Sequence, residues 1–429
     1  MSGPRLQSGG RATSLPADRG SGSAIGGSTA GAKLWQHAAV RRITDEERRA
    51  RLARRHHLAV EHRAADVVAA TRALVCLHAT DPATVFLSAH ARVDAMTVAD
   101  LERALYVDRT LVKHLAMRRT LFVFPREHVA IAQAAASTRV AATERSRLSR
   151  FVQEGGLHRD GARWLAAASK AVLKVLDGGE ALTFPELRTR VPLLEGSIVY
   201  APDRKWGGAL PVGSRVLTVL SAEGKIVRGA NRGGWHVSRP EWASMQRWLG
   251  EPLEVPSAAE ATAALVGHWL RAFGPGTEND LKWWLGSTLT AVRRALADLE
   301  AVAVALDGGE TGYVLPDDLD DTKPVRPWVA LLPPLDPTPM GWADRAWYLG
   351  EHKPHVFDRN GNVGPTVWCD GRIVGGWRQD AGGAIELQLL EPVSRSQRRL
   401  IDVEARRLGT WMKGLAVKPR FPSPLSKLK

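Results

Sequence analysis

The feature that most constrains the fold is one pattern that occurs three times along the 429 residues. Each copy has several short helix-forming segments, followed by β-forming residues near a turn. The first copy has predicted helices at 66–77, from Pro82 and at 97–106, then a segment at 111–125 whose first part can finish a helix and whose second part is a short strand ended by Pro125. The second copy has predicted helices at 164–176, from Thr183 and at 212–222, then strands at 225–229 and 234–237 around Asn231-Arg232-Gly233. The third copy has predicted helices at 265–273, from Thr277 and at 287–299, then strands at 302–306 and 312–315 around Asp307-Gly308-Gly309.

Local signals place the starts of two helices, one before the first copy and one within it. Thr44 followed by Glu47 has the form of a capping box and predicts a helix through residue 55. The arginines of that helix are expected to form a solvated face. Asp81 directly precedes Pro82, which is the order of an N-cap and a first helical residue. A helix is therefore predicted to begin at Pro82.

Short helices followed by a β-hairpin are typical of a winged helix. The three copies are unequally spaced, so they predict three separate modules rather than a continuous solenoid. The fold class is expected to be α+β, with three tandem winged-helix units. The predicted boundaries are a disordered tail at 1–32 and winged helices at 33–126, at 127–250 with a linker helix, and at 251–322.

The pattern changes from residue 323 onward. Short β-forming segments predominate there, and Asp370-Gly371 is a strong hairpin turn. A small C-terminal β-barrel-like domain is therefore expected at 323–418, closed by a helix at 394–412, with a basic and loose tail at 419–429. The predicted strands are at 329–332, 346–349, 366–369, 372–377 and 385–390.

Charge indicates the class of partner. The formal net charge is +14, which favours a polyanion, either nucleic acid or an anionic membrane surface. The chain has no apolar run of the roughly 18 residues that a membrane span needs, and its N-terminus lacks the apolar core of a signal peptide. Nucleic acid is thus the preferred partner, in the cytoplasm and associated with the nucleoid. The two cysteines, Cys76 and Cys369, are expected to be buried and free.

Several stretches, in order and spacing, resemble the AlkZ/YcaQ-type family of winged-helix DNA glycosylases. The resemblance spans about residues 35 to 415 and implies three winged helices followed by a β-barrel, which agrees with the pattern above. It also implies a double-stranded DNA partner that carries damage. The matching stretches are Leu77 to Pro82, Leu111-Val112 with Met117-Arg118, Gly224 to Val227, Ala272 to Pro275, Leu331 to Pro333 with Leu335 to Pro337, Gly341 to Arg345, Pro365 to Val367 and Asp370 to Gly375.

The resemblance implies a catalytic site at His78 and Thr80. Family members have a Gln-x-Gln or Gln-x-Asp signature there, with an apolar residue between, whereas this chain has His78-Ala79-Thr80. A neutral imidazole could accept a proton from water and a threonine hydroxyl could orient that water, but a protonated His78 would repel a cationic sugar. His78 could also be a buried structural histidine, and Asp81, a possible second base, is more simply an N-cap. Asp336 and Arg345 are further possible site residues.

Basic residues near the predicted wings are expected to contact DNA phosphates, and Trp235 could stack or wedge at a lesion. Any one of them could instead be a solvated charge or a packed ring, and Trp283-Trp284 is expected to be packing. No histidine spacing indicates a metal site and no phosphate-binding glycine loop is present, so no metal and no cofactor is expected. The DNA-binding candidates are Lys113, Arg118, Arg119, Arg228, Arg232 and Trp235.

Two main hypotheses follow. The first is a monofunctional DNA glycosylase, acting as a monomer, that excises N7-alkylated purines or unhooks crosslinks. The second is a non-catalytic, regulatory winged-helix protein that kept the scaffold and lost the chemistry. A weaker third hypothesis is a binder of small aromatic ligands. The His-Ala-Thr sequence is what separates the first two.

Overall fold

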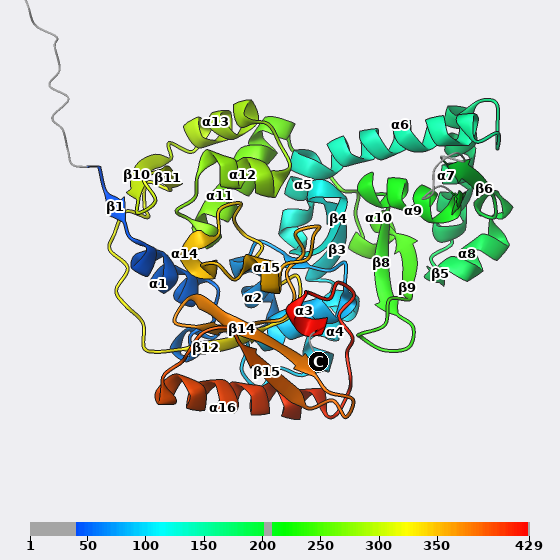
Figure 1. The fold of residues 1–429 in the computed structure, drawn as a ribbon. Coiled ribbons are helices and arrows are strands. Elements are labelled where there is room, and N and C mark those ends of the chain that lie inside the picture. The colour runs from blue at the N-terminus through cyan, green and yellow to red at the C-terminus, as the bar shows by residue number, and fades with distance from the viewer. Residues whose placement is uncertain (1–39, 201–207, 428–429) are drawn as a thin grey trace, which may run out of the picture. The chain divides into compact units, whose positions relative to one another are not determined.

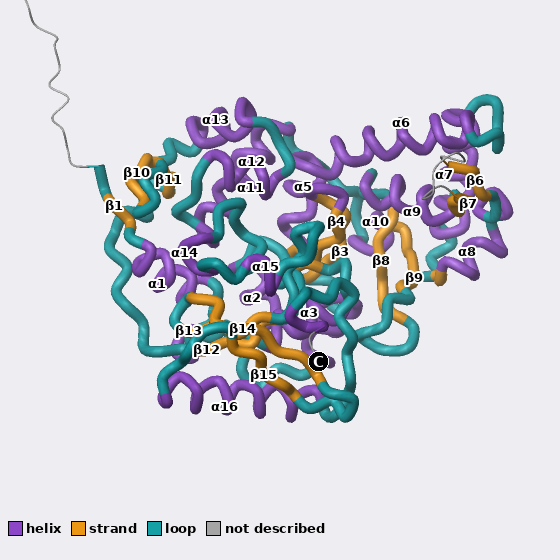
Figure 2. The backbone as a smooth tube through the Cα atoms, viewed as in Figure 1, coloured by secondary structure: helices purple, strands orange, loops and turns teal. Residues whose placement is uncertain are grey.

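The structure is a computed structural model that describes residues 40–200 and 208–427. It is a mixed α+β fold in which the strands form small separate sheets, shown in orange in Figure 2. The expected disordered tail at 1–32 lies outside the described residues. Helix α1 (Asp45–Arg55) begins where the sequence predicts, because the Thr44 hydroxyl accepts a hydrogen bond from the Glu47 amide.

The first three-stranded sheet has the order β2-β4-β3 and is antiparallel. It follows short helices, as expected, but the predicted helix at 66–77 ends at Ala73, and the segment at 111–116 is a strand rather than the end of a helix. Leu77 and the whole of 111–116 pair with β4 and so belong to a sheet, and the positive φ of Val75 separates Leu77 from the end of the helix. The elements are α2 (Val67–Ala73), β2 (Leu77–His78), α3 (Pro82–His90), α4 (Val98–Glu102), β3 (Leu111–Ala116) and β4 (Thr120–Pro125).

The second sheet has the order β5-β9-β8, which is the same order of first, third and second strand as in the first sheet. The predicted second strand of this hairpin, at 234–237, is part of a loop instead. Asn231, the last residue of β8, pairs with Pro240, the first residue of β9, so residues 232–239 form the connecting loop. The elements are α5 (Val129–Ala132), α6 (Thr138–Glu154), α7 (Gly161–Leu176), β5 (Leu182–Thr183), α8 (Phe184–Arg190), β6 (Ser197–Tyr200), β7 (Gly208–Pro211), α9 (Gly213–Ala222), β8 (Ile226–Asn231), β9 (Pro240–Ser244) and α10 (Met245–Leu249).

The third sheet joins a hairpin to the start of the described chain. Strand β1 (Arg42–Ile43) pairs in parallel with β10, and Gly276 forms an isolated bridge to Tyr313 of β11. Helix α12 begins with a capping box in which Thr277 and Asp280 bond each other's backbone amides. The elements are α11 (Ala258–Phe273), α12 (Glu278–Leu285), α13 (Leu289–Asp298), β10 (Val302–Leu306) and β11 (Thr311–Val314).

The C-terminal sheet is antiparallel with the order β12-β13-β14-β15. Its first and last strands are not paired with each other, so in the described residues it is an open sheet and not a closed barrel. Helix α16 lies along it, as Figure 1 shows. The strand predicted at Ala346–Leu349 is a helix, because Arg345 O accepts from both Tyr348 and Leu349. The elements are β12 (Val329–Leu332), α14 (Ala346–Leu349), α15 (Lys353–Val356), β13 (Thr366–Cys369), β14 (Arg372–Gln379), β15 (Ile385–Leu389) and α16 (Arg395–Met412).

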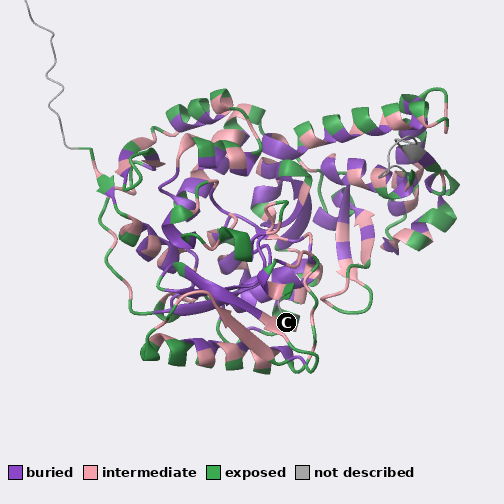
Figure 3. Ribbon diagram, viewed as in Figure 1, coloured by how far each residue is buried: buried purple, intermediate pink, exposed green. Residues whose placement is uncertain are grey.

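The expectation that the arginines of α1 form a solvated face is wrong for two of them. Arg48 and Arg51 are buried instead of solvated, because Arg51 pairs with Glu47 and Asp318 at 2.9 Å and Arg48 stacks on the Trp347 ring at 4.1 Å. Asp318 comes from a distant part of the chain that no local pattern reveals. Figure 3 shows the outer faces of α6, α13 and α16 exposed and much of β14 buried. None of the helices in residues 40–200 and 208–427 has the length and hydropathy of a membrane span.

Candidate nucleic-acid interface and active site

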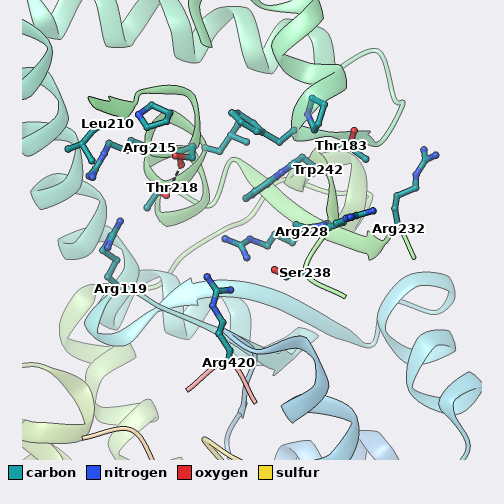
Figure 4. Close-up of a pocket in the computed structure, with 17 residues that line it drawn as sticks. Arg119, Thr183, Leu210, Arg215, Thr218, Arg228, Arg232, Ser238, Trp242 and Arg420 are labelled. Atoms are coloured by element: carbon teal, nitrogen blue, oxygen red, sulfur yellow. Dashed lines mark hydrogen bonds between the residues drawn. The ribbon is translucent and has the colours of Figure 1, made fainter. Parts of the chain in front are cut away.

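Arginine side chains gather in one groove of about 770 Å³, drawn in Figure 4 and called here the arginine groove. Its walls come from α8, α9, β8, the loop before β9, the turn between β3 and β4, and the C-terminal segment after α16. Among the described residues that line it there is no aspartate and no glutamate. The arginines in its lining are Arg119, Arg215, Arg228, Arg232, Arg239 and Arg420.

Two of these arginines are neutralised by neighbouring carboxylates. Arg119 pairs with Glu144 at 2.8 Å and Arg232 pairs with Glu241 at 2.6 Å. The other four have no carboxylate within ion-pair distance in the described part of the chain. A groove that collects unpaired cations attracts polyanions and holds them through guanidinium–phosphate hydrogen bonds. The unpaired arginines are Arg215, Arg228, Arg239 and Arg420.

Arg228 lies at the centre of this arrangement. It belongs to β8, and its guanidinium carbon lies 5.0 Å from the centre of the Trp242 ring on the paired strand β9. Burial, and then the nearby charge of Arg420, lower the pKa of Arg228 to about 10. It therefore remains a cation at neutral pH. Figure 4 shows Arg119, Arg228 and Arg420 reaching toward the same space from three parts of the chain.

The predicted signature residues form the loop between β2 and α3. His78 ends β2, where it pairs with Phe122 of β4, and the Ala79 amide continues the pairing by donating to Leu121 O at 2.9 Å. Asp81 caps α3 by accepting from the Ala83 amide. The sheet and the cap together fix the loop at both ends.

His78 is neutral at physiological pH. Its ring borders a small cavity of about 20 Å³ together with Cys76, Arg118 and Trp284. Burial, and then the charge of Arg118, lower the pKa of His78 to about 3. Its Nδ1 accepts a hydrogen bond from the Thr80 amide at 3.4 Å, which leaves the proton on Nε2. A neutral imidazole does not repel a cationic sugar, and one with so low a pKa is a poor general base.

Thr80 and Asp81 link this loop to the arginine groove. The guanidinium of Arg420 donates to the Thr80 carbonyl at 3.3 Å, and the Arg420 amide donates to Asp81 Oδ2 at 3.0 Å. The Thr80 hydroxyl has no hydrogen-bond partner among the described residues and is partly exposed. It can therefore bind a water molecule. The Asp81 carboxylate is buried and holds two backbone amides.

Asp336 and Arg345 lie apart from the groove. Asp336 is fully buried, pairs with Arg92 at 2.7 Å and accepts from Ser88 at 2.7 Å. These bonds occupy the carboxylate in the protein interior. Arg345 stacks on the Trp283 ring at 4.7 Å.

Trp283, which the sequence suggests is packing only, is flanked by a second arginine. The guanidinium of Arg118 lies 4.2 Å from the centre of the same ring. Sequence periodicity could not show this, because the two arginines come from the β3–β4 turn and from the segment before α14.

Lys113 is buried in the interior instead of reaching a phosphate. Its ammonium nitrogen donates to the Tyr106 hydroxyl at 2.8 Å and to the Gly229 carbonyl at 3.1 Å. Burial, and then the charge of Arg228, lower its pKa to about 7. The side chain therefore joins the first and second sheets from inside.

Trp235 is also a packing residue in this structure. Its ring centre lies 5.1 Å from that of Phe86 and 5.5 Å from that of Trp411. The structure thus brings together only part of the predicted DNA-binding set: Arg119, Arg228 and Arg232 in the groove, with Arg118 on the other side of the turn.

Sequence reasoning missed three groove arginines. Arg215 lies on α9, Arg239 comes directly before β9, and Arg420 lies in the segment expected to be a loose tail. The position of Arg215 on the last helix of a winged-helix pattern was a usable signal. In the described residues, no group of three or more His, Cys, Asp and Glu side chains is placed to hold a metal ion.

Comparisons with known proteins identify the family of the chain. The sequence model of the family described as "DNA glycosylase AlkZ-like" matches residues 71–411. An "Interstrand DNA cross-link repair glycosylase" of Streptomyces sahachiroi is 26% identical over 220 residues, which cover 49% of this chain and 56% of that protein. The solved structure of Streptomyces sahachiroi DNA glycosylase AlkZ has a TM-score of 0.68 and 21% identity, over 89% of this chain and 99% of that one. The chain therefore belongs to the AlkZ-like DNA glycosylase family.

Proposed function

We propose that this protein binds duplex DNA in the arginine groove and hydrolyses the N-glycosidic bond of N7-alkylated purines at the β2–α3 loop. The observation that carries the proposal is the direct connection between the two features. Arg420 lines the groove and donates to the carbonyl of Thr80 in the loop. DNA held by the groove would thus place a nucleotide next to Thr80.

The proposed reaction needs little activation by the enzyme, because the alkylated base is a good leaving group. N7 alkylation makes the purine cationic, so it leaves as a neutral base when its bond to the sugar breaks. Water then adds to the cationic sugar carbon and releases one proton to the solvent. The free hydroxyl of Thr80 is suited to orient that water. Because His78 is neutral, it does not repel the cationic sugar. The hydrogen bond from the Thr80 amide to its Nδ1 holds the loop in place. We propose an orienting role for Thr80 and a positioning role for His78.

The architecture supports this proposal. We propose that the first three sheets and their helices are three winged helices, with boundaries near 33–126, 127–250 and 251–322. The shared strand order of the first two sheets supports this. In the third, the Gly276–Tyr313 bridge takes the place of the first strand. Helix α9 would then be the recognition helix of the second unit, and it carries Arg215 into the groove. The segment at 323–418 would be the C-terminal domain. We also propose that the protein acts as a monomer.

The test is a base-excision assay on duplex DNA containing N7-methylguanine, with alkali cleavage of abasic sites. Wild type is expected to give strand breaks above the spontaneous rate. Thr80→Ala and His78→Ala are expected to lower the rate at least roughly tenfold, since the water and the loop lose their orientation. Thr143→Ala, on the exposed face of α6, is the matched control and should excise normally.

A second candidate function is a DNA-binding protein without chemistry. The reason to test it is the signature itself, because His78-Ala79-Thr80 stands where the family has Gln-x-Gln or Gln-x-Asp. Tight DNA binding without any excess of breaks, on N7-methylguanine and on crosslinked duplexes alike, would select this function and reject the glycosylase.

A further inference from the structure

The segment after α16 is anchored against the rest of the protein on both sides of Arg420. On one side, the Gln379 amide nitrogen donates to Leu415 O at 2.9 Å and its oxygen accepts from the Val417 amide at 2.8 Å. On the other, the Leu425 side chain is buried. The expectation of a loose tail from residue 419 is therefore wrong for its described part. Figure 1 shows this segment, in red, running back past α3.

Asp81 supplies the central anchor. One carboxylate oxygen caps α3 through the Ala83 amide at 3.3 Å, and the other accepts the Arg420 amide at 3.0 Å. The same carboxylate thus sets the start of the helix and the position of the segment. Because the backbone of Arg420 is held there, its side chain extends from a fixed point at the β2–α3 loop.

The Arg420 guanidinium has no carboxylate partner in the described residues. It is exposed, donates to the Thr80 carbonyl, and faces Arg228 across the groove. The two cations lie close enough for Arg420 to contribute to the lowered pKa of Arg228. Like charges held side by side on rigid supports are stabilised when an anion lies between them.

We propose that residues 415–427 are an arm of the DNA interface, and that Arg420 binds a backbone phosphate beside the nucleotide that faces Thr80. The arm lies beyond residues 71–411, which the family model matches. The guanidinium fork suits a phosphate, which it can bind through two parallel hydrogen bonds. Asp81 is a positioning residue that docks the arm. This inference rests on the proposed function, since it assigns a contact within the same groove.

Equilibrium binding of the full chain to N7-methylguanine and undamaged duplexes, at several salt concentrations, tests the contact. Arg420→Ala is expected to weaken binding to both duplexes roughly tenfold, the effect of one charge-assisted hydrogen bond, and to lower the salt slope by about one. Arg420→Lys should retain most of the slope because it keeps the charge. Lys418→Ala, an exposed cation of the same arm that does not line the groove, is the matched control and should change binding less than about twofold.

Binding by Arg420→Ala that equals that of Lys418→Ala, with an unchanged slope, would overturn the arm contact while leaving the glycosylase proposal standing. Absence of DNA binding by wild type at low salt would overturn both. Normal binding by wild type without excision would reject the glycosylase alone. The three outcomes are therefore distinguishable.

Asp81→Asn tests the docking separately. Asparagine is as good an N-cap as aspartate, so α3 should persist. The two backbone amides bond to different oxygens of Asp81, and asparagine has an NH2 group, which cannot accept, in place of one of them. The arm is expected to open, which would accelerate trypsin cleavage between Arg420 and Phe421 and weaken DNA binding to the level of Arg420→Ala. Cleavage at the wild-type rate, with a normal circular dichroism spectrum and normal DNA affinity, would show that Asp81 does not position the arm.

Discussion

At the scale of single residues, burial and distant partners decide what each charged side chain does. Arg228 and Lys113 are both basic residues near a predicted wing, yet one lines the groove and the other is enclosed with its ammonium nitrogen bonded to Tyr106 and Gly229. The sequence gives the same signal for both. Their roles differ because Lys113 lies on the inner face of β3, which only the packing of the second sheet against the first determines.

Lys113 should make stability depend on pH. Its pKa in the folded protein is about 7, below the ordinary 10.5, so between these values the unfolded chain binds a proton that the folded chain does not. Stability due to this group therefore rises with pH across that window, by at most about 1.4 kcal/mol for each pH unit. Denaturant unfolding of wild type and Lys113→Met at pH 7 and pH 9 measures it. If the free energy of unfolding rises equally in both proteins between pH 7 and pH 9, Lys113 does not have the lowered pKa that burial gives it.

At the scale of elements, local signals predicted helix starts well and strand registers poorly. Thr44, Asp81 and Thr277 mark the starts of α1, α3 and α12, because a cap depends only on residues within one turn. In the second copy the sequence predicts the second strand of the hairpin at 234–237, but that strand begins at Pro240. The sequence also predicts a strand at Ala346–Leu349, where the structure has a helix. Strand pairing depends on partners far along the chain, so alternation alone could not set these bounds.

The α12 start is expected to carry more stability than an ordinary cap. One oxygen of Asp280 completes the capping box with Thr277, and the other accepts the Ala343 amide at 2.8 Å, so this carboxylate also ties the third unit to the C-terminal part. Thr277→Ala should cost about 1 kcal/mol, the usual value of a cap. Asp280→Ala should cost clearly more, because the half-buried Ala343 amide also loses its acceptor. If the two variants lose the same free energy of unfolding in denaturant, the bond from the Ala343 amide to Asp280 does not contribute to stability.

The candidate site was predictable in part. The resemblance pointed to the β2–α3 loop, and net charge pointed to a polyanion, but neither could show that Arg420 bonds to Thr80 from 340 positions away. Asp336 is a possible site residue from the sequence because it lies in one of the stretches that resemble the family, although Asp336-Pro337 is also an ordinary turn. In the fold it neutralises Arg92 in the interior. A sequence pattern cannot tell these two outcomes apart, since burial belongs to the whole chain.

At the scale of the whole molecule, six of the described arginines line one groove where α9 and β8, the β3–β4 turn and the segment after α16 meet. Three separate parts of the chain contribute the groove arginines, so the proposed DNA contact depends on the assembled fold rather than on any one of these parts. Such a surface releases counterions from DNA, and its affinity falls steeply as salt rises.

The most direct test of the account is the salt dependence of duplex DNA binding by wild type and Arg228→Ala. Arg294→Ala, on the exposed face of α13 and outside the groove, is the control. The account predicts a steep decline of affinity with salt for wild type, a slope lower by about one for Arg228→Ala, and no change for the control. Equal slopes for all three proteins, or negligible binding at low salt, would contradict the assignment of the arginine groove as the DNA-binding surface.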